Sequence, residues 1–196
     1  FEVTDAQIFL SRRAPLKMAY AFSLGEHLPE KQRAALSDPP FTPQQPGMLP
    51  AGQSLLKAAL KKDILLSYPY ETMEPFLQMI REAAGDPHVV SIRITIYRLA
   101  RKAQLVEYLC AAAENGKDVT VLIELRARFD EQNNIDWSER LEEAGCKIIY
   151  GFEDYKVHSK ICLITRQDRA GLRYITQVGT GNYNEKTAAQ YTDVSL

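Results

Sequence analysis

Apolar and polar positions alternate along this chain in two periods, and from residue 55 onward the two periods follow one another in a regular order. Apolar positions three or four residues apart predict helices at 55–60, 73–85, 103–113 and 135–144. Runs rich in β-branched residues predict strands at 64–66, 89–98, 119–125 and 147–150, and a hairpin at 157–164 and 173–178. Strands that alternate with helices are typical of an α/β domain. We expect a mixed, largely parallel sheet with helices on both faces.

The first fifty residues do not share this alternation. Residues 7–10 are expected to form the last strand of a preceding unit, and residues 15–24 a short helix that ends at Gly25. Half of the chain's 10 prolines lie between Pro39 and Pro50, a density that predicts a linker. The start without Met indicates a fragment of a longer protein. The expected parts are the end of a preceding domain at 1–38, a proline-rich linker at 39–52 and an α/β domain at 53–196.

Composition adds little to this picture but excludes several functions. Apolar residues make up 45% and charged residues 25% of the chain, which are ordinary values for a globular protein. The net charge of −1 gives no support to nucleic-acid binding, so an anionic ligand must be met by a local cluster of cations. The three cysteines form no Cys-x-x-Cys pair and indicate reduced thiols in a cytoplasmic protein. No apolar run reaches the ~20 residues of a membrane helix, and no signal peptide is visible.

One predicted strand carries the residues to which the chemistry points. In the stretch 157–161, His158 and Lys160 alternate with small or apolar side chains. Since neighbouring side chains on a strand point to opposite faces, these two share one face. A nucleophilic imidazole beside a fixed cation suits a phosphate, although such a pair at a strand end is in most proteins plain solvated surface. Two further features favour the phosphate site.

Arginines at the ends of two other predicted strands are the first of these features. One strand ends at Arg98, and the next strand along the chain is followed by Arg128. Ligands of α/β sheets bind at the carboxyl ends of the strands, so both arginines are expected to converge with His158 and Lys160. Guanidinium groups bind phosphate oxygens in bidentate fashion, so the cluster predicts a phosphate site. Glu124, in the same region, is expected only to neutralise a neighbouring arginine.

A glycine-containing loop is the second feature. The sequence Gly-Thr-Gly-Asn at 179–182 follows the last predicted strand and precedes a short helix, for which Asn184 is a suitable N-cap. Glycines let the backbone approach a ligand closely and expose N–H groups that bind anions. Alone, such a triplet is a plain turn, and its meaning comes from its place after the His-x-Lys strand. A Walker-type loop is excluded, because the Gly-Lys pair at 116–117 lacks both the upstream Gly and the following Ser or Thr.

These motifs together resemble two related kinds of enzyme. His158-x-Lys160 with a later Gly-x-x-Asn resembles one half of a phospholipase D-type site, although that motif expects an acidic residue where this chain has Thr165. Longer matches resemble bacterial polyphosphate kinase, which carries a modified phospholipase D-like site. They are the sequences Ile-Tyr-Arg at 96–98, Ala-Arg-Phe-Asp-Glu at 127–131, Lys-Val-His-Ser-Lys at 156–160, and 179–187 with Tyr-Thr-Asp at 191–193. The resemblance covers residues 55–196 and implies the fold of a phospholipase D-like half.

The resemblance implies a transferase that moves the terminal phosphate of ATP to inorganic polyphosphate and back to ADP. His158 would carry the phosphoryl group as phosphohistidine. Lys160, Gly181 and Asn182 would bind phosphate. A neutral imidazole is a competent nucleophile, and phosphoryl transfer needs mainly alignment and charge stabilisation, so this chemistry agrees with the residues.

The same resemblance implies further ligands and partners. Arg98 and Arg128 would hold phosphate oxygens together with Mg²⁺, which guanidinium groups reach only through phosphate. Tyr191 would lie at the nucleotide. The full-length protein would be a cytoplasmic homo-oligomer with peripheral membrane association.

Two other functions stay open at this point. A phospholipase D-like phosphodiesterase would also form a phosphohistidine but would cleave a diester. A non-catalytic module would bind polyphosphate or nucleotide without chemistry. In either enzyme the isolated fragment is expected to be inactive, because phospholipase D-like sites are assembled from two halves that each supply a histidine.

Overall fold

The chain divides into two compact units. The computed structural model describes residues 4–7, 18–39, 41–49, 52–100, 103–125 and 131–196. The units are Phe1–Phe41 and Thr42–Leu196. The first contains the 3-10 helices η1 (Asp5–Gln7) and η2 (Met18–His27) and the α-helix α1 (Glu30–Leu36), in which no residue is buried.

Two predictions concern the first unit. Of the strand expected at 7–10, only Gln7 is described, and it lies in η1. The rest of that prediction falls outside the described residues. Of the helix expected at 15–24, the described part begins at Met18 as a 3-10 helix. Since this helix continues through Gly25 to His27, the glycine does not end it.

Part of the proline-rich stretch packs on the second unit. Gln44 forms an isolated parallel bridge with Glu71: its N–H donates to the Tyr70 carbonyl at 2.8 Å, and its carbonyl accepts from the Thr72 N–H at 2.9 Å. Leu49 is buried in the core of this unit. This part of the stretch is therefore held in place, while the exact domain boundaries stay predictions.

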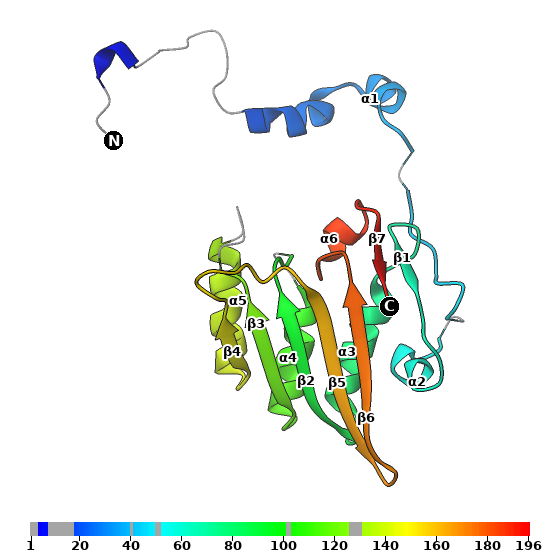
Figure 1. Cartoon of the computed structure of the whole chain (residues 1–196). Coiled ribbons are helices and arrows are strands. Elements are labelled where there is room, and N and C mark those ends of the chain that lie inside the picture. The colour runs from blue at the N-terminus through cyan, green and yellow to red at the C-terminus, as the bar shows by residue number, and fades with distance from the viewer. Residues whose placement is uncertain (1–3, 8–17, 40, 50–51, 101–102, 126–130) are drawn as a thin grey trace. The chain divides into compact units, whose positions relative to one another are not determined.

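The second unit is an α/β domain built on one seven-stranded sheet, with the strand order β1-β7-β6-β5-β2-β3-β4 (Figure 1). The strands are β1 (Leu66–Tyr68), β2 (Val89–Ile96), β3 (Asp118–Ile123), β4 (Lys147–Tyr150), β5 (Lys160–Asp168), β6 (Gly171–Gly179) and β7 (Asp193–Ser195). The helices are α2 (Leu55–Ala59), α3 (Glu74–Gly85), α4 (Gln104–Glu114), α5 (Glu131–Glu143) and α6 (Glu185–Ala188). Each element predicted from residue 55 onward is present: β4 has the predicted bounds, and the others have shifted ends. The three-residue strand β7 was not predicted.

The pairing of the strands confirms a mixed sheet but corrects its proportions. β2 and β3, and β3 and β4, pair in parallel, whereas β5 pairs antiparallel with both β2 and β6, and β7 antiparallel with β6 and β1. The sheet is therefore parallel only at β2-β3-β4, and most of it is antiparallel. The hairpin accounts for one of these antiparallel pairs, β5 with β6, because strands joined by a tight turn run in opposite directions.

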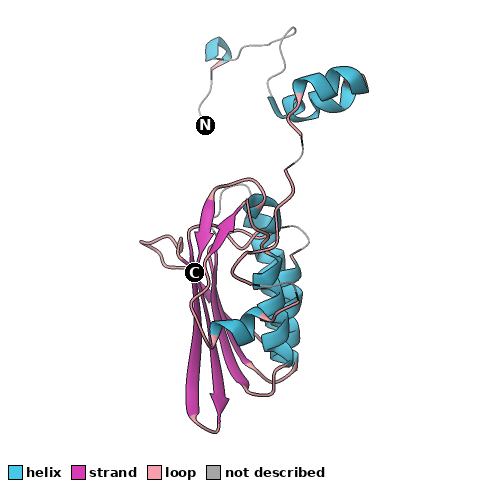
Figure 2. Ribbon diagram, turned by 90° about the vertical axis from the view of Figure 1, so that its right-hand side faces the viewer, coloured by secondary structure: helices cyan, strands magenta, loops and turns pink. Residues whose placement is uncertain are grey.

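The long helices lie on a single face of the sheet. Figure 2 shows the helices of this unit on one side of the strands. Beneath them Ile92, Val121 and Ile164 are completely buried. On the other face Ile161 is 39% exposed and Leu122 is half-buried. The expectation of helices on both faces is wrong for the described residues, because the connections from β4 to β5 and from β5 to β6 contain no helix.

The strand directions bring five chain segments to one edge of the sheet, which we call the carboxyl edge. β2, β3 and β4 are parallel and end there. β5 runs against β2 and therefore begins there, and β6 runs against β5 and ends there, with Gly179 opposite Lys160. The predicted convergence of the strand ends is thus confirmed. It is the upper edge of the sheet in Figure 1.

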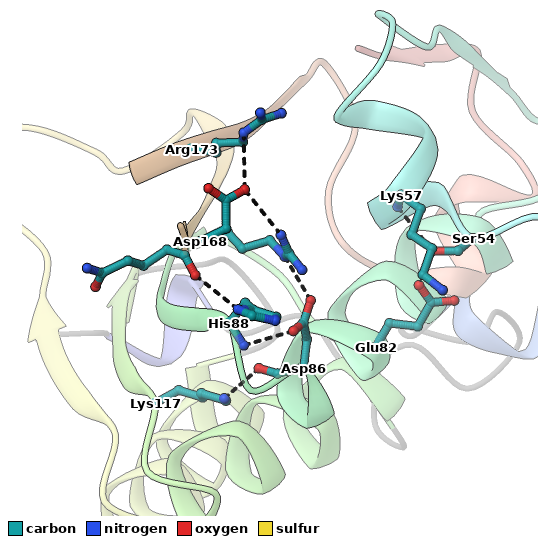
Figure 3. A network of polar contacts seen from close by, with 10 residues as sticks. Ser54, Lys57, Glu82, Asp86, His88, Lys117, Asp168 and Arg173 are labelled. Carbon is teal, nitrogen blue, oxygen red and sulfur yellow. Dashed lines mark hydrogen bonds and ion pairs between the residues drawn. The ribbon is translucent and has the colours of Figure 1, made fainter. Parts of the chain in front are cut away.

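The opposite edge, which we call the amino edge, carries a network of paired charges (Figure 3). Arg166 Nε lies 2.9 Å from Asp86 Oδ2, and Arg173 Nε lies 3.3 Å from Asp168 Oδ2. His88 Nδ1 lies 3.2 Å from the Gln167 carbonyl oxygen and thereby links the start of β2 to β5. Burial alone would raise the pKa of Asp86, but the His88 N–H and the Arg166 guanidinium outweigh it and lower that pKa.

The cysteines behave as structural residues. Cys110, Cys146 and Cys162 are buried and unpaired, as expected. Burial raises the pKa of the Cys146 and Cys162 thiols to about 12, so neither is a reactive thiolate at neutral pH. Among the helices that the structure describes, none has both the length and the apolar character needed to span a bilayer.

Candidate active site at the carboxyl edge

His158 lies in the connection between β4 and β5, two residues before β5, and not within a strand as predicted. Two anchors hold its neighbours. Glu124, buried directly after β3, accepts a hydrogen bond at 3.0 Å from the Val157 N–H through its Oε2. Thr95, near the end of β2, donates from Oγ1 to the Ser159 carbonyl at 2.6 Å. The backbone is thereby fixed on both sides of His158, without a strand at that point.

The ring of Tyr97, the residue that follows β2, is the centre around which the charged groups gather. The imidazole of His158 makes a T-shaped contact with it, with ring centroids 4.9 Å apart and an interplanar angle of 81°. Arg98 Cζ, Lys156 Nζ and Lys160 Nζ lie 5.6, 6.0 and 5.7 Å from the ring centroid. These distances lie at or within the ~6 Å at which a cation is attracted to an aromatic face. The structure therefore brings His158, Lys160 and Arg98 together, as predicted.

Lys160 is largely withdrawn from water. The residue is only 5% exposed, and its Nζ donates a hydrogen bond to the His158 carbonyl at 2.6 Å. Burial lowers the pKa of Lys160, and the charge of Asp193 partly opposes this. No ion pair between the described residues includes Lys160. A desolvated ammonium bound to a neutral carbonyl retains its charge for an incoming anion.

His158 itself is exposed and set up as a neutral imidazole. Its partial burial has the larger effect on its pKa, and the charges of Lys160 and Lys156 add to it: all three lower that pKa below the ordinary value. At neutral pH the ring is therefore uncharged and keeps the lone pair that a nucleophile needs. An open hollow of about 520 Å³ lies beside it, and its walls are Leu122, Phe152, Tyr155, Lys156, Val157, His158 and Ser159.

Helix α5 fixes the segment that carries Tyr97 and Arg98. Asn134 is completely buried, and its Nδ2 donates to the Tyr97 carbonyl at 3.0 Å and to the Glu124 carbonyl at 2.8 Å. Trp137 Nε1 donates to the carbonyl of residue 100 at 3.2 Å. Sequence reasoning singled out neither residue: Asn134 lies one position before the helix predicted at 135–144, and Trp137 lies within it. The signal of Asn134 was an amide one residue before an apolar helical pattern, which is too weak to single out.

The glycine loop is held against Asp193. Thr180 Oγ1 donates to Asp193 Oδ1 at 2.7 Å and accepts from the Val194 N–H at 3.0 Å. A Cβ at Gly181 would meet three side-chain atoms of Asp193 at 2.7–2.9 Å, so only glycine fits there without a shift. The Oδ1 atom of Asn182 is buried and has no hydrogen-bond partner among the described residues. An unsatisfied buried oxygen next to a tightly packed glycine marks a place where a donor is missing.

The remaining predictions for the loop region have different outcomes. Asn184 is the N-cap of α6, as expected, and its Oδ1 accepts from the N–H groups of residues 186 and 187, each at 3.1 Å. Tyr191 is 63% exposed and lies between α6 and β7. Arg128 lies outside the described residues. The roles of these residues toward a ligand stay predictions.

Thr165 stands where the phospholipase D-type motif expects an acidic residue. Thr165 is buried within β5, opposite Tyr174 of β6, and away from the carboxyl edge, where β5 begins at Lys160. A carboxylate does contact the glycine loop: it belongs to Asp193, which the sequence analysis named only as the end of the matched Tyr-Thr-Asp sequence and to which it gave no role. The loop and the acidic residue are thus linked through β7, a strand that was not predicted.

Comparisons with known proteins agree with this geometry. The family model of the polyphosphate kinase C-terminal domain 1 matches residues 54–196. Polyphosphate kinase of Staphylococcus epidermidis is 42% identical over 195 residues, which are 100% of this chain and 26% of that protein. Polyphosphate kinase of Pseudomonas aeruginosa is 42% identical over 198 aligned positions, which are 100% of this chain and 28% of that protein. The chain therefore spans about a quarter of the length of such relatives.

Solved structures show the same relationship. The crystal structure of polyphosphate kinase from Porphyromonas gingivalis superposes with a TM-score of 0.71 at 38% identity, over 86% of this chain and 28% of that chain. Nuc from Salmonella typhimurium, a phospholipase D family member, superposes with a TM-score of 0.51 at 16% identity, over 67% of this chain and 78% of that chain. The second likeness concerns the fold alone and confirms the phospholipase D-like architecture. The chain thus belongs to the polyphosphate kinase family, and its residues 54–196 are the C-terminal domain 1 of that family.

Proposed function

We propose that this domain carries the phosphoryl-accepting histidine of an ATP:polyphosphate phosphotransferase. The observation that supports this most is the neutral imidazole of His158 beside the partly desolvated ammonium of Lys160, both in contact with one aromatic ring. A neutral nucleophile and nearby cations are what transfer of a phosphoryl group requires.

The reaction has two steps. A ring nitrogen of His158 attacks the terminal phosphorus of ATP, the bond to the bridging oxygen breaks, and ADP leaves with that electron pair. A terminal oxygen of polyphosphate then attacks the same phosphorus, the N–P bond breaks, and the neutral imidazole is restored. Lys160 and Arg98 stabilise the charge on the phosphoryl oxygens in both steps. The Nδ2 group of Asn182 and the N–H of Gly181 donate to the phosphate chain, and Arg128 and Tyr191 complete the nucleotide site.

Mg²⁺ is the implied metal. Among the described residues no group of three or more His, Cys, Asp or Glu side chains is arranged to hold a metal ion. The cationic residues of the site fit a metal that is bound by the phosphate oxygens of the nucleotide. Bound in this way, Mg²⁺ would neutralise phosphate charge, and Arg98 and Lys160 would orient the phosphate oxygens that do not bind the metal.

The isolated chain is proposed to be inactive. A site of this fold that is assembled from two halves needs a second histidine, and the other histidines here do not supply it: His88 lies at the amino edge and His27 in the first unit. Residues 1–196 should therefore neither elongate polyphosphate nor label His158 with ATP. Orientation by the missing half is worth about 7–11 kcal/mol of barrier, so turnover at the rate of the full-length protein would contradict the two-half arrangement.

The test of the proposed function uses the full-length protein with ATP, Mg²⁺ and a polyphosphate primer, and a second substrate, bis(p-nitrophenyl) phosphate. We expect ADP release to match chain growth, no diester cleavage, and loss of both ADP release and growth in His158→Gln. Diester cleavage without chain growth would identify a phosphodiesterase instead. Tight polyphosphate binding with no phosphoenzyme would identify a binding module.

A further inference from the structure

The parallel ladder between β2 and β3 ends beside the proposed site. At its end the Glu124 N–H donates to the Ile96 carbonyl at 2.9 Å. The next carbonyls, of Tyr97 and Glu124, both accept from one side chain: Asn134 Nδ2 donates to them at 3.0 and 2.8 Å. An amide nitrogen carries two hydrogens, so a single group can bind both carbonyls. The ends of two strands are thus joined through one residue of α5.

Both residues that Asn134 binds also contact the segment of His158. The Tyr97 ring makes the T-shaped contact with the His158 imidazole, with ring centroids 4.9 Å apart. The carboxylate of Glu124 accepts at 3.0 Å from the N–H of Val157, the residue before His158. The second route is buried along its length, because Asn134, Glu124 and Val157 are each at most 5% exposed. Asn134 therefore reaches the imidazole by one route and the adjoining backbone by another.

The hydrogen bonds of Asn134 are not those that stability alone would favour. Its side chain is completely buried, yet its Oδ1 atom has no hydrogen-bond partner among the described residues. A buried polar atom without a partner lowers stability and needs an explanation. With the amide turned over, that oxygen would face two carbonyl oxygens, so the two donated bonds fix the orientation of the side chain. Joining the two strand ends beside His158 explains why an amide stands here.

We propose that Asn134 is a positioning residue that orients the His158 imidazole for attack, through Tyr97 on one side and Glu124 on the other. The proposal deepens the proposed function and rests on His158 as the phosphoryl acceptor. Asn134 touches no substrate in this role. It fixes the distance and angle between the ring nitrogen and the incoming phosphorus, so its loss should act mainly on the rate of phosphoryl transfer.

Asn133 offers a matched control on the same helix. It is the same type of residue, and its Nδ2 donates to the Leu99 carbonyl at 3.2 Å. That carbonyl belongs to neither of the two routes to His158. Loss of this hydrogen bond therefore tests the attachment of α5 to the same segment without disturbing either route.

Single-turnover phosphorylation of the full-length protein by ATP and Mg²⁺ tests the proposal in Asn134→Ala and Asn133→Ala. The amplitude counts the correctly folded sites, and the rate constant reports how well the nucleophile is placed. We expect Asn134→Ala to slow phosphohistidine formation about 100-fold at unchanged amplitude, the loss that a misplacement of ~1 Å causes. Asn133→Ala should stay within about 3-fold of the parent rate, since it loses one hydrogen bond outside both routes.

Amide hydrogen exchange of the full-length protein without ATP tests the same link independently of the chemistry. In Asn134→Ala the Val157 N–H should exchange at least about 10-fold faster, because its acceptor is no longer held. The amides of β5 in that variant, and the Val157 N–H in Asn133→Ala, should exchange as in the parent protein. Absence of a phosphoenzyme in the parent would count against the proposed function, whereas unchanged exchange at Val157 would overturn the role of Asn134.

Three kinetic results would also overturn the proposal. They are an unchanged rate of phosphorylation in Asn134→Ala, a lowered amplitude at the parent rate, or equal slowing by Asn133→Ala. If Asn134→Ala does not fold, Asn134→Ser decides, because its hydroxyl keeps one donor: it must slow phosphorylation at full amplitude. Failure of that variant to fold as well would make Asn134 a structural residue and would contradict the positioning role.

Discussion

The two edges of the sheet both gather cations around a histidine, but they treat the charge in opposite ways. At the amino edge Arg166 lies 2.9 Å from a carboxylate oxygen of Asp86, and Arg173 lies 3.3 Å from one of Asp168 (Figure 3). At the carboxyl edge Lys160 donates to a neutral carbonyl and lies over the Tyr97 ring. In the first arrangement the charges hold β2, β5 and β6 together. In the proposed function, the charge of Lys160 in the second arrangement binds phosphate.

The histidines follow the same division. His88 is held by its neighbours: its backbone N–H donates to Asp86 Oδ1 at 2.8 Å, and its ring nitrogen Nδ1 lies 3.2 Å from the Gln167 carbonyl oxygen of β5. His158 lies beside an open hollow, and partial burial together with the nearby cations lowers its pKa. His88 is thus a structural link between two parts of the chain, whereas the surroundings of His158 suit the nucleophile that we propose it to be.

Separate substitution of the two histidines should give the largest difference in the rate of polyphosphate synthesis. His158→Gln is expected to reduce polyphosphate synthesis by the full-length protein at least ~10⁴-fold, because no other group replaces the nucleophile. His88→Gln should leave the rate within about 2-fold, since His88 lies at the other edge and loses one hydrogen bond worth ~1 kcal/mol. Initial rates of ADP release measure both. Equal losses in the two variants would remove the distinction between the edges.

Two lysines make the next comparison. Lys160→Met should lower kcat ~10²- to 10³-fold, the loss expected when one group that stabilises transition-state charge is removed. Lys117→Met removes a hydrogen bond of 2.7 Å to the Asp86 carbonyl at the amino edge. It should cost about 1 kcal/mol of the free energy of unfolding and leave kcat unchanged. A nearly unchanged kcat in Lys160→Met would show that this ammonium does not touch the reacting phosphate.

Two glycines test how tightly the site is built. Gly181→Ala places a methyl group 2.7 Å from Asp193 Oδ2, so the loop must shift, and we expect kcat to fall roughly 10- to 100-fold through misplacement. Gly85→Ala has no atom within 4 Å of the new Cβ and ends a helix at the amino edge, so activity should be unchanged. Steady-state kinetics and thermal unfolding of both variants provide the comparison. Full activity in Gly181→Ala would mean that Asp193 moves freely.

The smallest effect should be a pH-dependent loss of stability at the amino edge. The pKa of Asp86 is lowered in the folded state, so its ionised form stabilises the fold above the ordinary carboxyl pKa. This contribution is lost as the pH falls through the lowered value. Asp86→Asn should therefore cost about 1 kcal/mol at pH 7 and less at pH 3. Urea unfolding at the two pH values measures it, and an equal cost at both would show that the charge of Asp86 is not what matters.

Local sequence was sufficient to predict the helices and strands of the α/β domain other than β7, and the edge at which the site lies. The helical and strand periods from residue 55 located the helices and strands, because burial of one face imposes those periods. The strand-end rule then brought Arg98, Lys160 and His158 together, although His158 proved to lie outside the strand. That error left the site intact, since anchors from Glu124 and Thr95 fix the backbone where a strand would have done so.

Features that depend on distant partners were not predicted. Glu124 also accepts a hydrogen bond from the Val157 N–H, 33 residues away, and Asn134 reaches Tyr97 across 37 residues. The helices lie on a single face because the connections before and after β5 contain no helix. The sequence gives no periodic pattern by which that arrangement could be predicted. The Tyr97 ring became visible as the centre of the site only when the cations were placed around it.

The most direct measurement is the location of the phosphate on the full-length protein. The protein is incubated with ATP and Mg²⁺, digested under alkaline conditions that preserve phosphohistidine, and its peptides are analysed by mass spectrometry. We predict one phosphoryl group on the peptide that contains His158, its removal when polyphosphate or ADP is added, and none on the peptide that contains His88. Phosphate on another residue of this domain, or a phosphorylated His158 that neither acceptor discharges, would contradict the account.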